Sequence, residues 1–227
     1  MSAIALIMRQ LAILGGTFDP VHWGHLLIAQ TALSQLNLTQ IIWVPDCLSP
    51  HKQPCSYEHR RSMVEQAITD NPNFILSPLE TVHTKPNDAL KTLTELQDTY
   101  SDSQWYWIIG IDAFQTLPHW YRREAVIPTC NWLVAPRPIT TTRVHSNKSQ
   151  RTQPLPDSQS SLLCQQVAQQ LASQDIQIRW QLLQMPAVGI SSTLIRQYCR
   201  QRRSIRYLVP EAVRAYIANH NLYLEQG

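Results

Sequence analysis

The chain has 227 residues and a formal net charge of +3, and 44% of its residues are hydrophobic against 15% charged. This composition is typical of a globular protein and excludes a disordered one. A chain of this length can bury a full core, and we expect a single domain over residues 1–227. The mildly basic charge falls short of a nucleic-acid-binding surface, so we expect no nucleic-acid partner.

The cysteines and the apolar runs constrain the compartment. The five cysteines are scattered and form no C-x-x-C pair: Cys47, Cys55, Cys130, Cys164 and Cys199. An odd, dispersed set argues against a disulfide framework or a zinc site and favours a reducing cytoplasm. No apolar run approaches the roughly 20 residues that cross a bilayer, so we expect no membrane partner.

Strand-like and helix-like segments alternate along the chain. Continuous apolar runs predict strands over 10–14, 40–44, 73–76, 105–109, 131–135 and 177–183. Apolar residues at helical spacing predict helices over 24–36, 57–68, 88–99, 192–201 and 210–219. Residues 138–160, rich in Thr, Ser, Gln, Asn and Pro, are predicted to form a polar surface loop, with helical spacing resuming at Leu162. The C-terminal part, 192–223, is predicted to be helical.

The repeated strand-then-helix units indicate an α/β fold. Apolar strands without polar alternation are typical of a parallel sheet covered by helices on both faces, which is a doubly wound arrangement. In such sheets ligands bind beyond the carboxyl ends of the strands. Functional residues are therefore expected directly after the predicted strands.

The strongest chemical signal is the string G-G-T-F-D-P-V-H-W-G-H over residues 15–25, which follows a strand and opens a helix. Gly15 and Gly16 are expected to let the backbone turn tightly and approach a ligand. The helix start offers free N–H groups and a positive dipole end, which bind anions. His22 and His25 share one face there and can donate to phosphate oxygens. The alternative is a glycine turn with two satisfied histidines.

A second string, I-S-S-T-L-I-R over residues 190–196, precedes the penultimate predicted helix. Hydroxyls and N–H groups at a helix start, with Arg196 one turn in, form a cradle for phosphates. Taken alone, the same string is an ordinary helix cap. Its pairing with the first string favours a phosphate site.

The first string resembles the H-x-G-H signature of the nucleotidyltransferase superfamily, and in its full length it resembles the bacterial nicotinate-nucleotide adenylyltransferases. The second string resembles the S-S/T-x-I-R motif of the same superfamily, and the resemblance spans about Leu11 to Tyr223. It implies a Rossmann-like fold and transfer of AMP from ATP to nicotinate mononucleotide. Mg²⁺ is implied to arrive with ATP, and no protein-built metal site is expected. The oligomeric state is left open.

The resemblance also implies a role for individual residues. His22, His25 and Arg196 are implied to be catalytic. The residues implied to bind ATP are Gly15, Gly16, Thr17, Phe18, Lys52, Ser191, Ser192, Thr193 and Ile195. The residues implied to bind the mononucleotide and its ribose are Ala89, Asp112, Trp120 and Arg137. Without the resemblance, Lys52 would be interpreted as a solvated lysine and Trp120 as a packing residue.

One departure leaves the acceptor open. The family's S-Y-T segment, which helps recognise the nicotinate carboxylate, is replaced by Asn87-Asp88-Ala89. An acidic Asp88 would repel a carboxylate, so nicotinamide mononucleotide is an alternative acceptor. A phosphopantetheine-type adenylyltransferase on the same core and a nucleotide-binding regulator without chemistry also stay open. The arginines near the C-terminus are better explained as a solvated face than as a nucleic-acid site.

Overall fold

The structure is a computed structural model that describes residues 8–46, 55–79, 89–136, 156–186 and 188–224. Its strands are β1 (Arg9–Gly16), β2 (Gln40–Pro45), β3 (Phe74–Leu76), β4 (Ser103–Gly110), β5 (Asn131–Ala135) and β6 (Arg179–Leu182). Its α-helices are α1 (Trp23–Gln35), α2 (Tyr57–Ile68), α3 (Ala89–Thr99), α4 (Ile111–Phe114), α5 (Arg123–Val126), α6 (Pro156–Ala172), α7 (Ser192–Arg200) and α8 (Glu211–Asn219). Two short 3₁₀-helices are η1 (Leu117–His119) and η2 (Ile127–Thr129).

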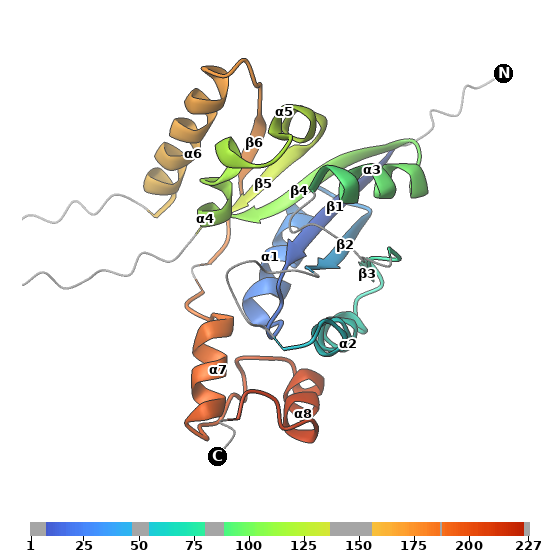
Figure 1. Cartoon of the computed structure of the whole chain (residues 1–227), viewed down its shortest axis with the longest axis vertical. Helices are drawn as coiled ribbons and strands as arrows, with labels where there is room; N and C mark the ends of the chain where they lie inside the picture. Colours follow the sequence, from blue (N-terminus) through green and yellow to red (C-terminus); the bar gives the residue numbers. More distant parts are fainter. Residues whose placement is uncertain (1–7, 47–54, 80–88, 137–155, 187, 225–227) are drawn as a thin grey trace, which may run out of the picture.

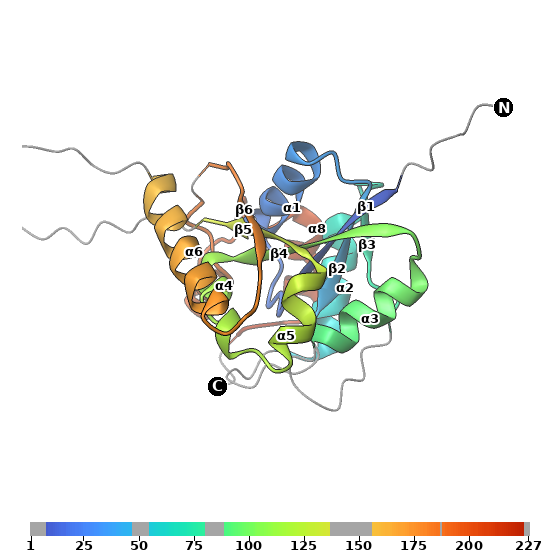
Figure 2. The ribbon, with the colours of Figure 1, turned by 90° about the horizontal axis from the view of Figure 1, so that it is seen from above.

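The six strands form one parallel sheet in the order β3-β2-β1-β4-β5-β6. Helices α1 and α2 pack on one side of it, where α7 and α8 join the same apolar cluster, and α3 to α6 pack on the other. Figure 2 shows this layering, with α1 and α3 on opposite sides of the strands. The doubly wound, Rossmann-like α/β fold expected from the sequence is therefore confirmed.

The core consists of two apolar clusters, one on each side of the sheet. Along β1, Leu11 and Ile13 face the α3–α6 side, and Ala12 and Leu14 face the α1–α2 side. Burial on both faces explains why the strands are continuous apolar runs, since neither side-chain direction reaches water. Within the described residues, no helix is long and apolar enough to cross a membrane.

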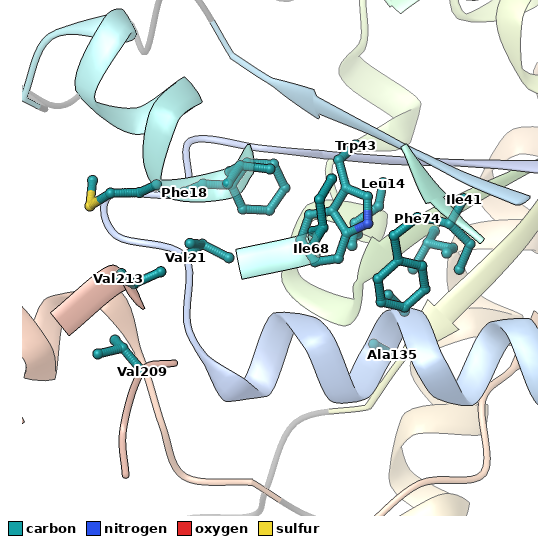
Figure 3. Close-up of a cluster of buried hydrophobic side chains, with 14 of the residues drawn as sticks. Leu14, Phe18, Val21, Ile41, Trp43, Ile68, Phe74, Ala135, Val209 and Val213 are labelled. Carbon is teal, nitrogen blue, oxygen red and sulfur yellow. The ribbon is translucent and has the colours of Figure 1, made fainter. Parts of the chain in front are cut away.

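The C-terminal segment, residues 188–224, contains α7 and α8 and adds no strand to the sheet. Its buried apolar side chains belong to the same cluster as those of α1 and α2. Figure 1 shows α7 and α8 beyond one end of the sheet. Val209 and Val213 are nevertheless buried and lie near Val21, which follows β1 (Figure 3). Apolar packing thus holds the end of the chain against the segment between β1 and α1.

Two features differ from the sequence expectation. Helix α6 begins at Pro156, inside the predicted loop 138–160. Proline is tolerated in the first turn of a helix. The residues that follow Pro156 are polar, so the first turn shows no apolar residues at helical spacing and was not predicted. The short elements between β4 and β5, from α4 to η2, were also missed, because three or four residues are too few to show a helical period.

The two central strands separate at their carboxyl ends. β1 pairs with β2 up to Gly16 and Pro45, and β4 pairs with β5 up to Gly110 and Ala135. Between β1 and β4, the last pair is Leu14 with Ile108. The chain leaves β1 toward α1 on one side of the sheet and leaves β4 toward α4 on the other. This is a topological switch point, where a doubly wound sheet opens a crevice for a ligand.

Helix α6 offers a matched test of the core on the α3–α6 side. Leu171 is 0% exposed and Leu162 is 59% exposed on the same helix. We expect Leu171→Ala to lower the free energy of unfolding by about 3 kcal/mol, because it leaves a cavity. Leu162→Ala should change it by less than about 0.5 kcal/mol. Urea unfolding of both variants measures the difference, and equal effects would contradict the assigned core.

Candidate active site

The segment after β1 makes a tight turn that does not use its glycines as expected. Neither Gly15 nor Gly16 has a positive φ; the left-handed residue is Phe18, with φ of 49°. A Cβ on Gly16 would lie 3.1 Å from the Phe18 ring, whereas a Cβ on Gly15 would meet nothing within 4 Å. Gly16 therefore makes room for the Phe18 ring, and the space beside Gly15 is open.

Phe18 is held in this conformation by packing. Its buried ring lies 5.3 Å from the ring of Trp43 and 5.1 Å, edge-on, from the ring of His25. Figure 3 shows the side chain directed toward Trp43 in the core. A left-handed backbone costs a non-glycine residue about 1–3 kcal/mol, which the buried aromatic contacts offset. The turn is thus anchored beneath the histidines.

His22 and His25 form a stacked pair at the start of α1. His22 is the N-cap residue and His25 lies in the first turn. Their ring centroids are 3.7 Å apart and the rings are inclined by 24°. The His22 backbone N–H donates to Nδ1 of His25 over 3.3 Å. Because Nδ1 of His25 accepts, the proton of a neutral ring is on Nε2, which is free to donate to a ligand.

Both rings are neutral at physiological pH. Burial lowers the pKa of His22 to about 4. Burial, and then the neighbouring His22, lower the pKa of His25 well below its usual value. Two imidazolium ions at stacking distance would also repel each other. The pair therefore offers neutral N–H donors at a helix start that already favours anions.

Gly24 is required by the position of His22. A Cβ on Gly24 would lie 2.9 Å from Nδ1 of His22 and 3.7 Å from the carbonyl oxygen of Ile190. Nδ1 of His22 is buried without a hydrogen-bond partner, so Nε2 is the nitrogen that can serve a ligand. The contact with Ile190 also shows that the starts of α1 and α7 lie side by side.

The start of α7 carries the second string. Ser191 is its N-cap and accepts from the Leu194 N–H over 3.2 Å. The Ser192 hydroxyl donates to the carbonyl of Pro20 over 2.9 Å, which ties α7 to the turn after β1. Thr193 Oγ1 accepts from Nη2 of Arg196 over 3.5 Å. Two helix starts therefore converge, which is an anion-binding arrangement.

Arg196 and Ile195 follow in the same helix with different surroundings. Nη1 of Arg196 donates to the carbonyl of Asp19 over 2.7 Å and lies 3.6 Å from its Oδ2. A guanidinium has five N–H donors, so others remain for a ligand. The Ile195 side chain is fully buried in the core. Its backbone N–H donates to the carbonyl of Ser191 over 3.1 Å, so Ile195 anchors the start of α7, and its expected ATP contact stays a prediction.

Three of the residues expected to bind the mononucleotide, Ala89, Asp112 and Trp120, belong to the α3–α6 side of the sheet. Asp112 is exposed on α4, directly after β4, and Ala89 is the first residue of α3. Trp120 is half-buried and its Nε1–H donates to Thr116 Oγ1 over 2.9 Å. Its ring packs edge-on against Trp132, 5.8 Å away. Thus Trp120 is fixed in place while keeping an exposed part.

Two expected site residues, Lys52 and Arg137, lie outside the described residues. So do Asn87 and Asp88 of the segment expected to meet the pyridine carboxylate.

Sequence reasoning missed two buried charged residues next to this site. Asp19, 6% exposed, was interpreted only as part of the string. Arg60 is 1% exposed and its Nη1 donates to the carbonyl of Thr17 over 2.7 Å. A single basic residue on the apolar face of α2, one turn before the buried Met63 and Val64, was the available signal.

Comparison with known proteins identifies the family. The family model described as cytidylyltransferase-like matches residues 13–198. A protein of Trichormus variabilis named "Probable nicotinate-nucleotide adenylyltransferase" is 48% identical over 97% of this chain and 100% of its own length. One of the same name from Lachnoclostridium phytofermentans is 34% identical over 96% of this chain and 100% of its own length.

Solved structures show the same fold. The nicotinic acid mononucleotide adenylyltransferase of Plasmodium falciparum complexed with NaAD matches with a TM-score of 0.69 and 18% identity, covering 95% of this chain and 97% of that one. The match to the family model and the identity to full-length relatives go further than the fold: the chain belongs to the cytidylyltransferase-like family and, within it, to the nicotinate-nucleotide adenylyltransferases.

Proposed function

We infer that the protein transfers AMP from ATP to nicotinate mononucleotide, which yields the deamido dinucleotide and pyrophosphate. The observation that carries this inference is the stacked, neutral pair His22–His25 at the start of α1, facing the start of α7 across the turn after β1. The names of the full-length relatives support the choice of acceptor.

The acceptor needs no activation by a protein base. Its phosphate is already an anion and attacks the α-phosphorus of ATP in line, so catalysis consists of positioning and charge stabilisation. Nε2–H of His25, and the matching nitrogen of His22, donate to the phosphoryl oxygens as charge develops on them. Backbone groups of Gly16, Thr17 and Phe18 line the point where the two nucleotides meet.

The start of α7 holds the part of ATP that leaves as pyrophosphate. We assign the β- and γ-phosphates to the N–H groups at Ser192 and Thr193 and to the remaining N–H donors of Arg196. Lys52 is assigned to the same phosphates as a point charge. Mg²⁺ arrives with ATP as part of the substrate; in the described stretches no three His, Cys, Asp or Glu residues gather into a metal-binding group.

The other side of the switch point binds the mononucleotide. Asp112 accepts from ribose hydroxyls, and the exposed part of Trp120 stacks on the pyridine ring. A backbone N–H at Ala89 and the side chain of Arg137 are assigned to the acceptor as well. We place the protein in the cytoplasm, where the four cysteines that the structure describes, all unpaired, would stay reduced.

Pyrophosphate release tests the reaction and the acceptor together. We expect release with Mg-ATP and nicotinate mononucleotide, and a reduction of about 10²–10³-fold in His25→Ala, since it removes a donor to the developing charge. His220→Ala, an exposed histidine on the C-terminal side, is the matched control and should be unaffected. Faster release with nicotinamide mononucleotide would show that the amide is the preferred acceptor. Release only with phosphopantetheine would contradict the proposed function and favour a phosphopantetheine-type adenylyltransferase.

The histidine geometry yields a second prediction. Gly24→Ala should displace the His22 ring, and a misplacement of about 1 Å can lower the rate about 10²-fold. The fold should survive, because alanine favours a helix more than glycine does. Gly189→Ala is the control, since a Cβ there meets nothing within 4 Å. The measurement is the steady-state rate of each variant. Normal turnover in Gly24→Ala would contradict the inference that a Cβ at this position displaces the His22 ring.

Burial of neutral histidines predicts that stability depends on pH. The pKa of His22 is about 4 in the folded chain and about 6.5 in the unfolded chain. Between these pH values the unfolded chain therefore binds more protons than the folded chain. The free energy of unfolding should therefore be highest above about pH 6.5 and fall toward pH 4, by up to about 1.4 kcal/mol per pH unit for this residue. Urea unfolding at several pH values should show a shallower slope in His22→Gln, and equal slopes would contradict a buried neutral ring.

A further inference from the structure

We propose that Asp19 is a positioning residue for ATP. Its carboxylate binds the Tyr223 hydroxyl and Arg196, and these contacts hold the C-terminal helices where they can bind the ATP phosphates. The inference rests on the proposed function, and it adds a role for Asp19 and Tyr223, neither of which is assigned to a substrate there. We name Asp19, Cys55, Arg196 and Tyr223 the Asp19 cluster.

Every contact of the buried Asp19 carboxylate in the cluster comes from a donor. Oδ1 accepts from the Tyr223 hydroxyl over 2.8 Å, from the Cys55 N–H over 3.3 Å and from the Cys55 thiol over 3.0 Å. Oδ2 lies 3.6 Å from Nη1 of Arg196. Burial raises the pKa of Cys55 to about 12 and raises the pKa of Tyr223 as well, so both side chains keep their protons. The carboxylate thus has partners on both oxygens, as a buried charge requires.

The cluster joins segments that are far apart in the chain. Tyr223 lies 204 residues and Arg196 lies 177 residues from Asp19, and both come from the C-terminal segment. The same segment also contacts the turn after β1 at Pro20 and the start of α1 at Trp23. The Ser192 hydroxyl donates to the carbonyl of Pro20, and the Trp23 N–H donates to the carbonyl of Leu208 over 3.2 Å. These two contacts join neutral groups, whereas the Asp19 contacts involve a buried charge, whose partners are the most costly to lose.

The position of Asp19 makes these contacts relevant to ATP. It follows Phe18, whose ring supports His25, and it precedes the histidine pair by three residues. Nη1 of Arg196 donates to the carbonyl of Asp19 and pairs with its carboxylate. The direction of the remaining guanidinium donors therefore depends on Asp19. Trp120, assigned to the mononucleotide, packs instead in the apolar cluster on the α3–α6 side of the sheet. A loosened Asp19 cluster should therefore weaken ATP binding and spare the mononucleotide.

The chain supplies a matched control for a purely structural role. Tyr216 on α8 also uses its hydroxyl to join the C-terminal segment to α2, with 3.1 Å to Nδ1 of His59. That contact involves no residue of the turn after β1. Tyr216→Phe and Tyr223→Phe thus remove the same atom from the same part of the protein, and only the second removal reaches Asp19.

The test is the binding of each substrate alone, measured by calorimetry with Mg-ATP and with nicotinate mononucleotide, alongside thermal unfolding. We expect Tyr223→Phe to weaken Mg-ATP about tenfold, as for loss of a hydrogen bond to a charged group, and to change mononucleotide binding less than about twofold. Tyr216→Phe should change neither by more than about twofold. Unchanged ATP binding in Tyr223→Phe, equal weakening of both substrates, or an equal effect of Tyr216→Phe would each overturn the proposal.

A double-mutant cycle with Asp19→Asn separates this proposal from failure of the proposed function. The effect of Tyr223→Phe on ATP binding should be clearly smaller in Asp19→Asn, because the amide oxygen that remains still accepts from the hydroxyl but carries no charge. Additive effects would overturn the coupling. If the wild-type protein released no pyrophosphate with any acceptor, the proposed function would fail while ATP binding still tested the cluster. Normal turnover with unchanged ATP binding in Tyr223→Phe would overturn the positioning role of the Asp19 cluster and leave the proposed function intact.

Discussion

The separation of β1 from β4 beyond Leu14 and Ile108 is the constraint on which the site depends. A parallel sheet normally satisfies each strand's backbone groups by its neighbours, but here the chain turns to opposite sides of the sheet at adjacent strands. The last residues of β1 and β4 therefore pair with their outer neighbours but not with each other. An added Cβ on Gly15 or Gly110 would meet nothing within 4 Å, so the backbone is accessible to a ligand on both sides of this separation. Among the described residues, those assigned to ATP lie in the turn after β1 and at the starts of α1 and α7, and those assigned to the mononucleotide follow β4 or begin α3.

Within the described residues, much of the favourable field at the site comes from two helix starts and from the neutral N–H donors of the histidine pair. Desolvation keeps the stacked histidines neutral, so each ring can offer an N–H donor to a phosphate without placing two positive charges at stacking distance. Arg196 and Arg60, two cations of the described site, are bound to protein oxygens. A chain with a net charge of only +3 can therefore bind highly charged nucleotides, because the favourable field is local and preformed.

The fold could be predicted well from the sequence, because buried parallel strands leave a direct apolar signal. The helix over 57–68 and the strand over 131–135 have the predicted bounds. Elements without a period, such as α4 and η1, and the polar start of α6 gave no such signal. The phosphate-binding strings were visible, but contacts between residues far apart in the chain, such as that of Asp19 with Tyr223, cannot be inferred from spacing. They depend on how the C-terminal helices pack.

Several residues of the first string act on one another more directly than on a substrate. Gly16 makes room for Phe18, Phe18 supports His25, and Gly24 makes room for His22. Asp19 in turn fixes Arg196 from the second string. Each of these contacts constrains a side chain that is assigned to phosphate or supports one that is, and an error of about 1 Å in such a constellation is costly. The length of the string is thus explained by mutual positioning: two histidines alone at a helix start would bind an anion, but they would not hold it in line for transfer.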